Sequence, residues 1–487
     1  MSSSVQRVLD AAIEGQARSP RHIQKQLSKL HATLAQEGPE IRSAIKSESQ
    51  HSTAEVEVQY ALALEAVATS FAASNFEKAL DAEFSLSRGE NALSNSIPYS
   101  VAYIVPSTFN ILHGSITAVA AAISAGSCVI LELPKSLSRT TELVQKTLSS
   151  SLDLDTFVIV NKRIDSKDLP KSIIRVFGNA EPDFQPTRTD LVPSSTRSIA
   201  IVDRTANTQE AAAAILRARF SFGGQSPLAP DLVLVNEFKI KEFCKSIAEL
   251  TSQYFAVQVE MNGSAAQASS EKARTARVSS HELDQAGAEV LISGSRGSVA
   301  RIEDRKSKLL RKRIQEPVLL IHPVRSLDDA IDFANGDGED LLSALFAFGS
   351  PDVVKYISQF VDARVCCANN IPIELLASPS TPLGFAASLQ GPYTKEMFSV
   401  PKPEFILYDK KSSRLQKVLV ENDVKEANNI RREAEVLDTK VNQPAGRLVG
   451  FFEQGILLGL GIALTTIVTG NVVFWKYGFP AIKRRIR

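Results

Sequence analysis

Cysteine is scarce in this sequence. The 487 residues contain four cysteines, and two of them, Cys366 and Cys367, are adjacent in the chain. A small secreted scaffold depends on many regularly spaced cysteines, so a disulfide framework is excluded and a reducing compartment is favoured for the bulk of the chain. Hydrophobic residues make up 44% of the sequence, which excludes a mostly disordered chain and is enough for large cores.

An excess of one charge is also absent. The chain has 55 Lys and Arg against 54 Asp and Glu, a formal net charge of +1. This balance excludes a strongly basic nucleic-acid binder and an acidic tail protein as descriptions of the whole chain. Residues 301–313 carry seven Lys and Arg. No aromatic residue interleaves with them, so we expect a solvated surface and no nucleic-acid partner.

Several motifs of catalytic and binding sites are missing. The sequence has no HExxH, no P-loop, no GxGxxG and no GxSxG pattern. The six histidines are scattered, without paired spacing on one helix face, so we expect no metal site. They are His22, His31, His51, His113, His281 and His322.

The N-terminus lacks the continuous apolar segment of a secretory signal. A long apolar run without charge lies near the other end, where residues 455–475 read GILLGLGIALTTIVTGNVVFW. About 20 apolar residues in a helix span a bilayer. Trp475 and Tyr477 stand where aromatic residues gather at a membrane interface, and basic residues follow. These are Lys476, Lys483, Arg484, Arg485 and Arg487.

This arrangement predicts a single-pass, tail-anchored membrane protein with its bulk in the cytosol. We expect a transmembrane anchor over residues 449–475, a charged stalk over 409–448 and a short basic tail over 476–487. The short basic tail fits the endoplasmic reticulum, the peroxisome or the mitochondrial outer membrane. Gly455 and Gly459 form a GxxxG step, which we attribute to the ordinary tolerance of membrane helices for glycine.

Between the termini, short apolar strands alternate with helices. A strand at 101–105 precedes an alanine-rich helix at 114–125, which Gly126 should end, since glycine readily adopts a left-handed C-cap. Strand and helix patterns continue to residue 347, which is typical of parallel sheets covered on both faces. Further strands are expected at 128–131, 157–160, 173–177, 198–202, 232–235, 318–321 and 344–347, and helices at 138–150, 208–221, 237–254 and 327–335. Residues 5–85 are helical in pattern, with a break at Gly38-Pro39 and a long helix at 54–72. Residues 263–280 read as a loop.

Several segments resemble the aldehyde dehydrogenase superfamily, most closely its class 3 or fatty-aldehyde branch. The phrase GQSPLAPD at 224–231 is similar to that branch's GQxCxAPD segment. The order and spacing of the similar segments hold from about residue 5 to 405. The others are EPVLL at 316–320, SLDDAI at 326–331, PLG at 382–384 and SLQGPY at 388–393.

The resemblance implies an α/β fold with two domains, followed by the transmembrane helix. A Rossmann-type nucleotide domain would span residues 1–204, and an α/β catalytic-type domain residues 205–408. It also implies NAD or NADP as coenzyme and pairing of subunits through a β-arm, as a homodimer or as a heteromer with an active relative. A tail anchor after the catalytic part also occurs in the fatty-aldehyde branch.

The chemistry of the family requires a cysteine thiolate that attacks the aldehyde carbon. The position of this nucleophile in GQxC aligns with Pro227, which has no nucleophilic group. Ser226 is adjacent, but a shift of one residue turns its hydroxyl away, and a hydroxyl is a far weaker nucleophile than a thiolate. The four cysteines read as small buried residues in strands and a helix.

Two further catalytic positions are substituted. The general-base glutamate of the family's ELGGK segment aligns with Asp190, and the two glycines after it are replaced by Val192 and Pro193. We expect Asp190 to be a surface residue. The oxyanion asparagine of the PWN motif aligns with Thr108, which has a shorter reach, and Asn110 could substitute only if the loop shifted.

The coenzyme positions are also altered. The lysine that holds the adenosine ribose aligns with Glu132, which reverses the charge. The phosphate-side GSxxxG motif keeps Gly178 but continues with Asn179 and Pro182-Asp183. A carboxylate there repels a pyrophosphate, and proline removes an amide donor. The glutamate that holds the nicotinamide ribose aligns with Arg313.

Three hypotheses follow. The first is a catalytically impaired family member, a pseudoenzyme that acts as a scaffold or as a partner subunit. The second is an oxidoreductase that oxidises long-chain or pathway-intermediate aldehydes to acids with NAD or NADP, based on the fold, the anchor and the remaining Asp190 and Thr108. The third is a binding module that holds a lipid chain. Substitution at several positions on two functional surfaces favours the first.

Overall fold

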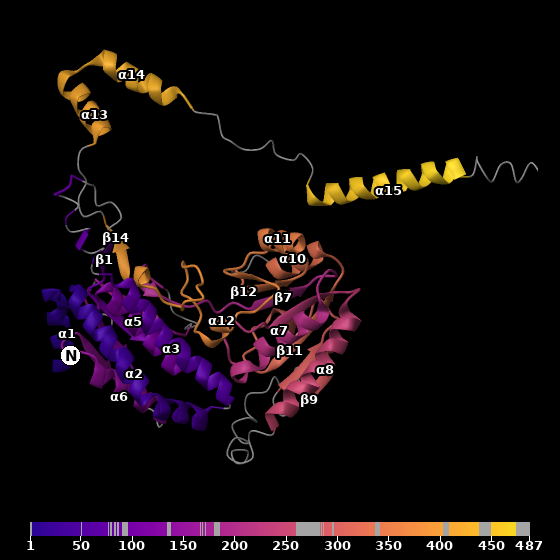
Figure 1. The fold of residues 1–487 in the computed structure, drawn as a ribbon, viewed down its shortest axis with the longest axis horizontal. Helices are drawn as coiled ribbons and strands as arrows, with labels where there is room; N and C mark the ends of the chain where they lie inside the picture. Colours follow the sequence, from indigo (N-terminus) through magenta and orange to yellow (C-terminus); the bar gives the residue numbers. More distant parts are fainter. Residues whose placement is uncertain are drawn as a thin grey trace, which may run out of the picture. The chain divides into compact units, whose positions relative to one another are not determined.

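The computed structural model divides the chain into two units, residues 1–407 and 408–487, each of which is described by itself. Figure 1 shows the elements of both. The described residues are 2–49, 51–75, 77, 80–81, 84, 87–89, 96–133, 138–165, 167, 169–170, 172–179, 186–259, 283, 285, 287–294, 297–336, 341–402, 409–437 and 450–473. The expected loop at 263–280 lies outside them.

The first unit begins with three helices, α1 (Ser3–Glu14), α2 (Pro20–Glu48) and α3 (Thr53–Ala73). The expected break at Gly38-Pro39 is wrong, because α2 runs through it. Leu34 and Ile41, on either side, are buried in the same apolar core, so packing outweighs the backbone hydrogen bond that proline removes. Gly38 leaves room for Tyr60, whose hydroxyl donates to the Leu34 carbonyl at 2.7 Å.

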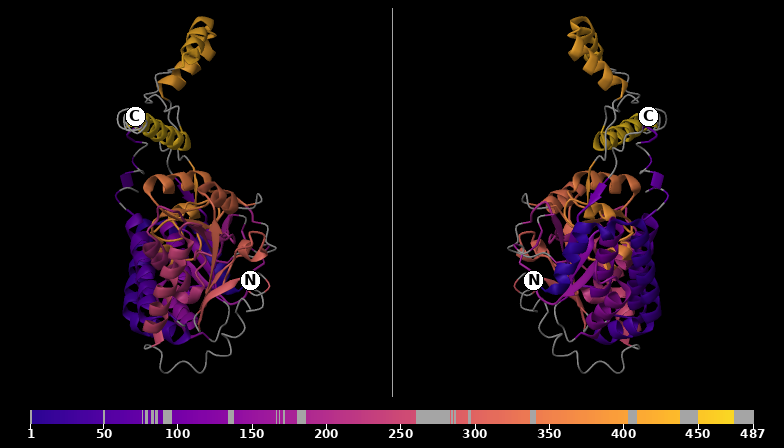
Figure 2. Two further views of the ribbon diagram at one scale, coloured as in Figure 1. Left: turned by 90° about the vertical axis from the view of Figure 1, so that its right-hand side faces the viewer. Right: turned by 90° about the vertical axis from the view of Figure 1, so that its left-hand side faces the viewer.

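A five-stranded sheet follows, with strand order β4-β3-β2-β5-β6 and all neighbours parallel. Along β2, Ala102 and Ile104 face a core shared with α2, α3, α5 and α6, while Val101 and Tyr103 face α1. Both faces are therefore covered, which explains why the strands are apolar runs (Figure 2). The elements are β2 (Val101–Val105), α5 (Ile111–Ala125), β3 (Cys128–Glu132), α6 (Arg139–Ser151), β4 (Phe157–Val160), β5 (Ile173–Phe177) and β6 (Asp190–Leu191).

Helix α5 begins three residues before the expected start, because Asn110 caps it. The Asn110 side chain accepts a hydrogen bond from the His113 amide at 3.2 Å. At the other end Gly126 has φ +94° and forms the left-handed C-cap, as predicted. The first turn of α5, which carries His113, is thereby fixed at the carboxyl end of β2.

A seven-stranded sheet has the order β13-β12-β7-β8-β11-β10-β9 and is parallel except for the edge strand β9. Residues of α7 and α8 pack on one face and those of α10 and α11 on the other. The antiparallel β9–β10 hairpin is absent from the sequence prediction. The elements are β7 (Ser198–Val202), α7 (Thr208–Phe220), β8 (Leu232–Asn236), α8 (Ile240–Val259), β9 (Glu289–Gly294), β10 (Gly297–Arg301), β11 (Val318–Val324), α10 (Leu327–Asn335), β12 (Ala344–Phe348), α11 (Pro351–Phe360), β13 (Cys366–Ala368) and α12 (Ile373–Ala377).

Two short strands form a separate antiparallel pair. Strand β1 (Ser96–Pro98) lies against β14 (Ser399–Pro401), so the end of the first unit returns to the start of the five-stranded sheet. Tyr393 and Phe398, just before β14, belong to the core of that sheet. The segment from Tyr393 to β14 therefore packs the last part of the first unit against its first part.

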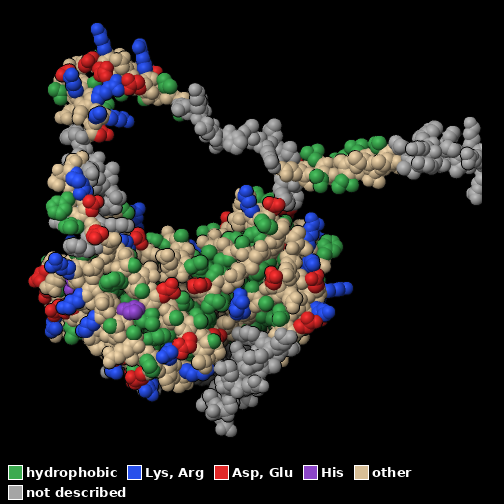
Figure 3. All heavy atoms as spheres, viewed as in Figure 1, with side chains coloured by type: hydrophobic (Ala, Val, Ile, Leu, Met, Phe, Trp, Pro, Cys, Tyr) green, Lys and Arg blue, Asp and Glu red, His purple; other side chains and the backbone are tan. Residues whose placement is uncertain are grey.

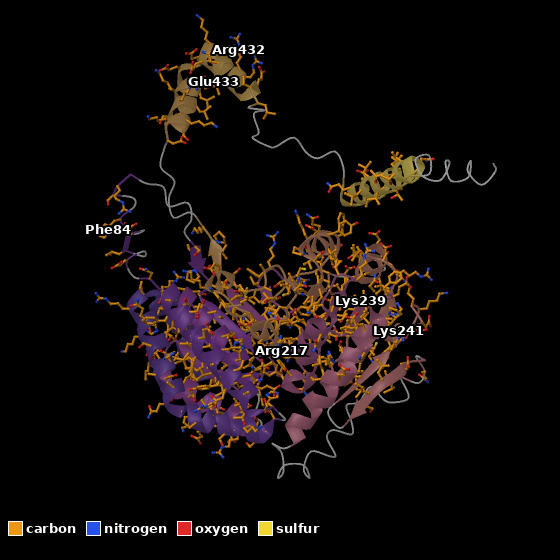
Figure 4. The ribbon with its side chains drawn as sticks, turned by 45° about the vertical axis from the view of Figure 1, so that its right-hand side comes forward. Phe84, Arg217, Lys239, Lys241, Arg432 and Glu433 are labelled. Atoms are coloured by element: carbon orange, nitrogen blue, oxygen red, sulfur yellow. The ribbon has the colours of Figure 1, made fainter. Side chains whose placement is uncertain are left out.

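The second unit has three helices, α13 (Lys410–Glu421), α14 (Val424–Glu435) and α15 (Phe451–Val473). Arg414 of α13 pairs with Glu426 at 2.6 Å and with Glu433 of α14 at 2.7 Å, and Glu433 is labelled in Figure 4. None of the described residues of α13 and α14 is buried.

Helix α15 is apolar and exposed. Within the described residues, the stretch Glu453–Asn471 alone is long and apolar enough to cross a membrane, judged by length and composition. Apolar side chains stand out along it in Figure 3. The predicted interfacial Trp475 and Tyr477 and the basic tail 476–487 lie outside the described residues.

The buried His113 makes a pH prediction possible. Burial lowers its pKa to about 4, while an unfolded histidine titrates near 6.5. Between these pH values the unfolded chain takes up a proton that the folded chain does not. The contribution of His113 to the free energy of unfolding is therefore fully present above about pH 6.5 and is lost as the pH drops towards 4. The loss approaches about 3 kcal/mol over this range.

We expect the substitution His113→Leu to remove that part of the acid sensitivity. Thermal unfolding of the full chain, followed by circular dichroism from pH 7 to pH 4.5, measures it. His31→Leu, at an exposed position of α2, is the matched control and should keep the acid sensitivity of the parent. Equal acid sensitivity in His113→Leu and the parent contradicts the prediction.

Candidate functional site

The carboxyl ends of β2 and β5 form the first part of the candidate site. The chain passes from β2 outwards through β3 to β4 and then returns to β5 on the other side of β2. In open α/β sheets, ligands bind where the strand order reverses in this way. The positions that the resemblance assigns to the oxyanion donor and to the phosphate motif, Thr108 and Gly178, both lie there.

Thr108 is held by the loop that follows β5. The side-chain oxygen of Asn179 accepts from the Thr108 amide and from the Thr108 hydroxyl, each at 3.4 Å. It also accepts from the Ser107 hydroxyl at 3.2 Å. Asn110 does not replace Thr108, because its oxygen caps α5 and its amide donates to the Ala377 carbonyl at 3.0 Å. The donors at this loop are therefore used within the protein.

Gly178 is pressed against the loop after β2. Its amide donates to the Val105 carbonyl at 2.7 Å. A Cβ atom on Gly178 would stand 2.0 Å from the backbone nitrogen of Ser107, so no other residue fits without moving the backbone. The two strand ends are in direct backbone contact. Pro182 and Asp183, the altered part of the motif, lie outside the described residues.

Glu132 lies at the end of β3 and is largely buried. It accepts a short hydrogen bond from the Tyr103 hydroxyl and lies 3.6 Å from the Arg163 guanidinium. Burial, together with this hydrogen bond, raises the pKa of Tyr103. The charge at the ribose position is thus negative, and it is balanced by a residue of the chain itself.

The expectation that Asp190 is a surface residue is wrong. Its side chain is buried, and both carboxylate oxygens bind the guanidinium of Arg175, at 2.6 and 2.7 Å. The amide and the hydroxyl of Thr187 donate to the same carboxylate, at 2.7 and 2.6 Å. Because β5 and β6 are neighbouring parallel strands, this pair joins them across the sheet edge. A carboxylate so fully engaged does not activate a water molecule.

The loop between α7 and β8 forms the second part of the candidate site. Phe222, Gly223 and Gly224 have φ values of +52°, +66° and +72°. The Phe222 amide donates to the Glu55 carboxylate of α3 at 2.8 Å, which helps to hold this unusual conformation. A Cβ on Gly224 would lie 2.8 Å from the backbone of Pro317, so the loop packs directly on the segment before β11.

Pro227 and Arg313 meet at this contact. The Nη2 atom of Arg313 donates to the Pro227 carbonyl at 3.2 Å, and both residues are half-buried. The Ser226 hydroxyl is buried and accepts from the Leu228 amide at 3.4 Å. The structure therefore brings together the positions that the resemblance assigns to the nucleophile and to the nicotinamide-ribose glutamate.

A buried ion pair holds both segments in place. Arg219 of α7 lies 3.6 Å from Asp231, and both side chains are almost fully buried. Arg219 donates to the carbonyls of Ile314, at 2.9 Å, and Glu316, while Asp231 accepts from the amides of Ser198 and Ile314, both at 2.8 Å. Burial raises the pKa of Asp231. The charge of Arg219 and the hydrogen bonds from the two amides lower it and so oppose this effect.

Sequence reasoning missed Arg219 as a functional residue. Arg217, two residues earlier, is exposed near Asn370 (Figure 4), and no local pattern separates the two arginines. The position of Arg219 in the helix could have indicated its burial, since it follows the buried pair Ile215 and Leu216 at helical spacing. A charge on the apolar face of a helix indicates a buried partner.

No cysteine replaces the missing thiol. Burial raises the pKa of all four thiols, that of Cys128 to about 12 and that of Cys367 to about 11, so none is a thiolate at neutral pH. Their predicted strands and helix are confirmed, but Cys128 alone is buried as expected. Cys244 and Cys367 are half-buried, and Cys366 is exposed on the edge strand β13. Among the described residues, no group of three or more His, Cys, Asp or Glu could hold a metal ion.

The strand ends of the five-stranded sheet do not fit a dinucleotide. Glu132 places a carboxylate at the position that the resemblance assigns to the ribose-binding lysine. Asn179 covers the amide of Thr108, which would otherwise be free to donate to a phosphate. Glu132 and Asp190 belong to two separate ion pairs, and neither lies in the Pro227–Arg313 contact.

Comparison with known sequences gives one family. Residues 193–394 match the sequence model of the "Aldehyde dehydrogenase family", a match over less than half of the chain. No curated protein sequence matches this chain.

Solved structures give the same fold. The substrate-bound state of AldH from Staphylococcus aureus has a TM-score of 0.62 and 16% identity, over 84% of this chain and 95% of that one. An NAD-dependent benzaldehyde dehydrogenase from Corynebacterium glutamicum has a TM-score of 0.60 and 14% identity, over 84% and 89%. Glyceraldehyde-3-phosphate dehydrogenase GapN from Methanocaldococcus jannaschii, complexed with NADP, has a TM-score of 0.58 and 11% identity, over 75% and 84%.

These matches support the expected α/β architecture with its two sheets. Residues 193–394 carry the sequence pattern of the aldehyde dehydrogenase family, and the chain has the fold of aldehyde dehydrogenases.

Proposed function

We propose that this chain is a membrane-anchored protein of the aldehyde dehydrogenase family that has lost dehydrogenase activity and acts as a scaffold or as a partner subunit of an active relative. The observation that carries the proposal is the contact between Arg313 and Pro227. A residue without a nucleophilic atom occupies the nucleophile position, and a cation occupies the position of a coenzyme-binding glutamate. In this proposal the chain descends from the class 3 or fatty-aldehyde branch and carries altered versions of its active-site motifs.

The catalytic steps explain why these substitutions matter. Attack on an aldehyde needs a thiolate or an activated hydroxyl with a base beside it. No described side-chain base accepts a hydrogen bond from the Ser226 hydroxyl, whose described bond is accepted from the Leu228 amide. Asp190 is engaged by Arg175, and Thr108 by Asn179. Loss of a single oxyanion donor typically lowers the rate about 10²–10³-fold, and here several parts are altered together.

Coenzyme binding is weak or absent in this proposal. One similar structure is complexed with NADP and another is of an NAD-dependent enzyme; either coenzyme would supply the hydride acceptor if bound. Glu132 argues against such binding, because a carboxylate replaces the cation that the resemblance expects at the ribose.

A role as a partner subunit is supported by features that serve assembly. The β1–β14 pair stands apart from the two large sheets, and the resemblance implies pairing through such an arm. Strand β13 is an open edge of the seven-stranded sheet, and edges of this kind can pair with another chain. We propose a homodimer or a heteromer with an active relative.

Membrane anchoring is supported by α15. Its described residues include a stretch long and apolar enough to cross a membrane, and its apolar side chains are exposed within its own unit. We propose that α15 spans the membrane of the endoplasmic reticulum, the peroxisome or the mitochondrial outer membrane, with the first unit in the cytosol.

The proposal predicts that the full chain in lipid nanodiscs does not form NADH or NADPH from hexadecanal above a protein-free control. Absorbance at the reduced-coenzyme band measures the rate. Pro227→Cys alone should not restore turnover, because Glu132 and Arg313 remain.

Steady coenzyme reduction by the parent chain overturns the proposal and supports the alternative, oxidation of long-chain or pathway-intermediate aldehydes. In that case Ser226→Ala identifies the nucleophile, since it abolishes the rate if the serine attacks. Thr196→Ala, which removes a hydroxyl away from the loop, is the matched control.

A second prediction concerns the anchor. The double substitution Leu460→Arg/Ile462→Arg places two charges in the middle of α15, at a cost of about 2.5–3.5 kcal/mol each for insertion. We expect the parent to remain in the membrane pellet after alkaline carbonate extraction and the double variant to appear in the soluble fraction.

Leu419→Arg, at an exposed position of α13, is the control and should behave like the parent. Release of the parent by carbonate, or retention of the double variant, counts against anchoring by α15.

A further inference from the structure

Helix α13 carries an apolar stripe that its own unit does not cover. Leu415, Val418 and Leu419 follow the spacing that places residues on one face of a helix. Leu415 and Leu419 are 41% and 81% exposed, whereas Val418 is half-buried. The hairpin of α13 and α14 therefore covers one side of the stripe only. The half-buried residues of the two helices are Arg414, Val418, Glu426 and Ile430.

The excess positive charge of the hairpin is on α13. This helix has four basic residues and one acidic residue, whereas α14 has three of each. Arg414 is used within the hairpin, since it pairs with Glu426 and Glu433 of α14. The other basic residues of α13 are exposed, and no described carboxylate lies within ion-pair distance of them (Figure 3). They are Lys410, Lys411 and Lys417.

One of these lysines has a weaker partner. Hydrogen bonds from Ser412 and, to a smaller extent, the charge of Lys411 lower the pKa of Asp409, the N-cap residue of α13. Asp409 is exposed, so solvent and salt screen this attraction. The positive charge of α13 is therefore available to an external anionic surface.

The apolar and basic residues lie on different sides of α13. Lys417 is two residues from Leu415 and two from Leu419, and residues two apart lie on nearly opposite sides of a helix with 3.6 residues per turn. Lys410 precedes Lys417 by two turns and shares its side. A helix with leucines on one face and lysines on the other is typical of helices that lie in the headgroup region of anionic membranes.

The position of the hairpin in the chain favours a lipid surface over a soluble partner. Only residues 436–450 separate α14 from α15, and even a fully extended chain of this length reaches at most about 50 Å. With α15 in a bilayer, the hairpin is held close to the lipid surface. Docking on that surface is then an intramolecular step with a high effective concentration, whereas a soluble partner has to be recruited from solution.

We propose that α13 docks on the surface of the membrane that α15 enters, with Leu415 and Leu419 at the boundary of headgroups and acyl chains and the lysines of α13 attracted by anionic headgroups. This inference rests on the anchoring by α15 in the proposed function and not on the loss of dehydrogenase activity. It gives the chain a second membrane attachment besides the spanning helix.

The test measures whether position 419 lies in the bilayer, with the full chain in nanodiscs of phosphatidylcholine and phosphatidylserine. Leu419→Trp places a fluorophore in the stripe, and Trp475→Phe removes the one native tryptophan. Bromine on the acyl chains quenches tryptophan at short range. We expect brominated lipid to lower the fluorescence of the Leu419→Trp chain about twofold or more, because such a helix buries its apolar face about 5–10 Å into the boundary.

Ser413→Trp in the same background is the matched control. Ser413 is exposed, lies two residues from Leu415 and so on another side of α13, and its replacement keeps every charge. Brominated lipid should leave its fluorescence nearly unchanged. Circular dichroism establishes that the variants keep the helix content of the parent.

A charge test uses Lys410→Gln/Lys411→Gln/Lys417→Gln in the Leu419→Trp chain. Each lysine near an anionic surface is expected to favour docking about fivefold, which corresponds to about 1 kcal/mol. The triple variant should therefore be quenched less than its parent, and added salt should reduce the quenching of the parent more than that of the triple variant.

Equal quenching of the Leu419→Trp and Ser413→Trp chains overturns the proposal. So does a Leu419→Trp chain whose emission is shifted to the blue but is not quenched, because protein, from this chain or from a second copy, then covers the stripe. Nanodiscs are isolated through a tag on their belt protein, so co-purification reports the anchor separately. A chain that does not co-purify contradicts both the anchor and this proposal, whereas an unquenched chain that co-purifies contradicts this proposal alone.

Discussion

The buried pair of Arg219 and Asp231 is the interaction on which the candidate site depends. It joins α7, the amino end of β8, the start of β7 and the segment 314–316, because each partner also binds backbone groups of these elements. Loss of one partner would leave the other as an uncompensated buried charge, which typically costs about 3–5 kcal/mol. The contact between Pro227 and Arg313 is therefore a consequence of this framework and not of local loop preference.

The family positions share one property in this chain: each substituted residue has a partner within the protein. Glu132 binds Tyr103 and Arg163, Asp190 binds Arg175, and Thr108 binds Asn179. Active sites usually keep polar groups unpaired and ready for a substrate. Internal pairing of this kind stabilises the folded chain and fits the proposed non-catalytic role. Arg313 follows the pattern with a neutral partner, the Pro227 carbonyl.

The sequence was sufficient for the strands and helices of the sheets, since apolar runs and glycine stops such as Gly126 depend on local periodicity and backbone geometry. The sequence was insufficient where contacts between residues far apart in the chain determine the local structure. The continuity of α2 through Pro39 depends on Tyr60 and a shared core, and the burial of Asp190 depends on Arg175 in a neighbouring strand. The partner of Arg313 could not be read from spacing either, because residues 227 and 313 meet only through the Arg219 network. The hairpin of β9 and β10 was missed although β9 contains the apolar run Val290-Leu291-Ile292, which is short and lies on a largely exposed edge strand.

The close approach of Gly178 to Ser107 constrains how such a protein can change over evolutionary time. Replacement of Gly178 by any other residue requires coordinated movement of the loops after β2 and β5, so this position is closed to stepwise substitution.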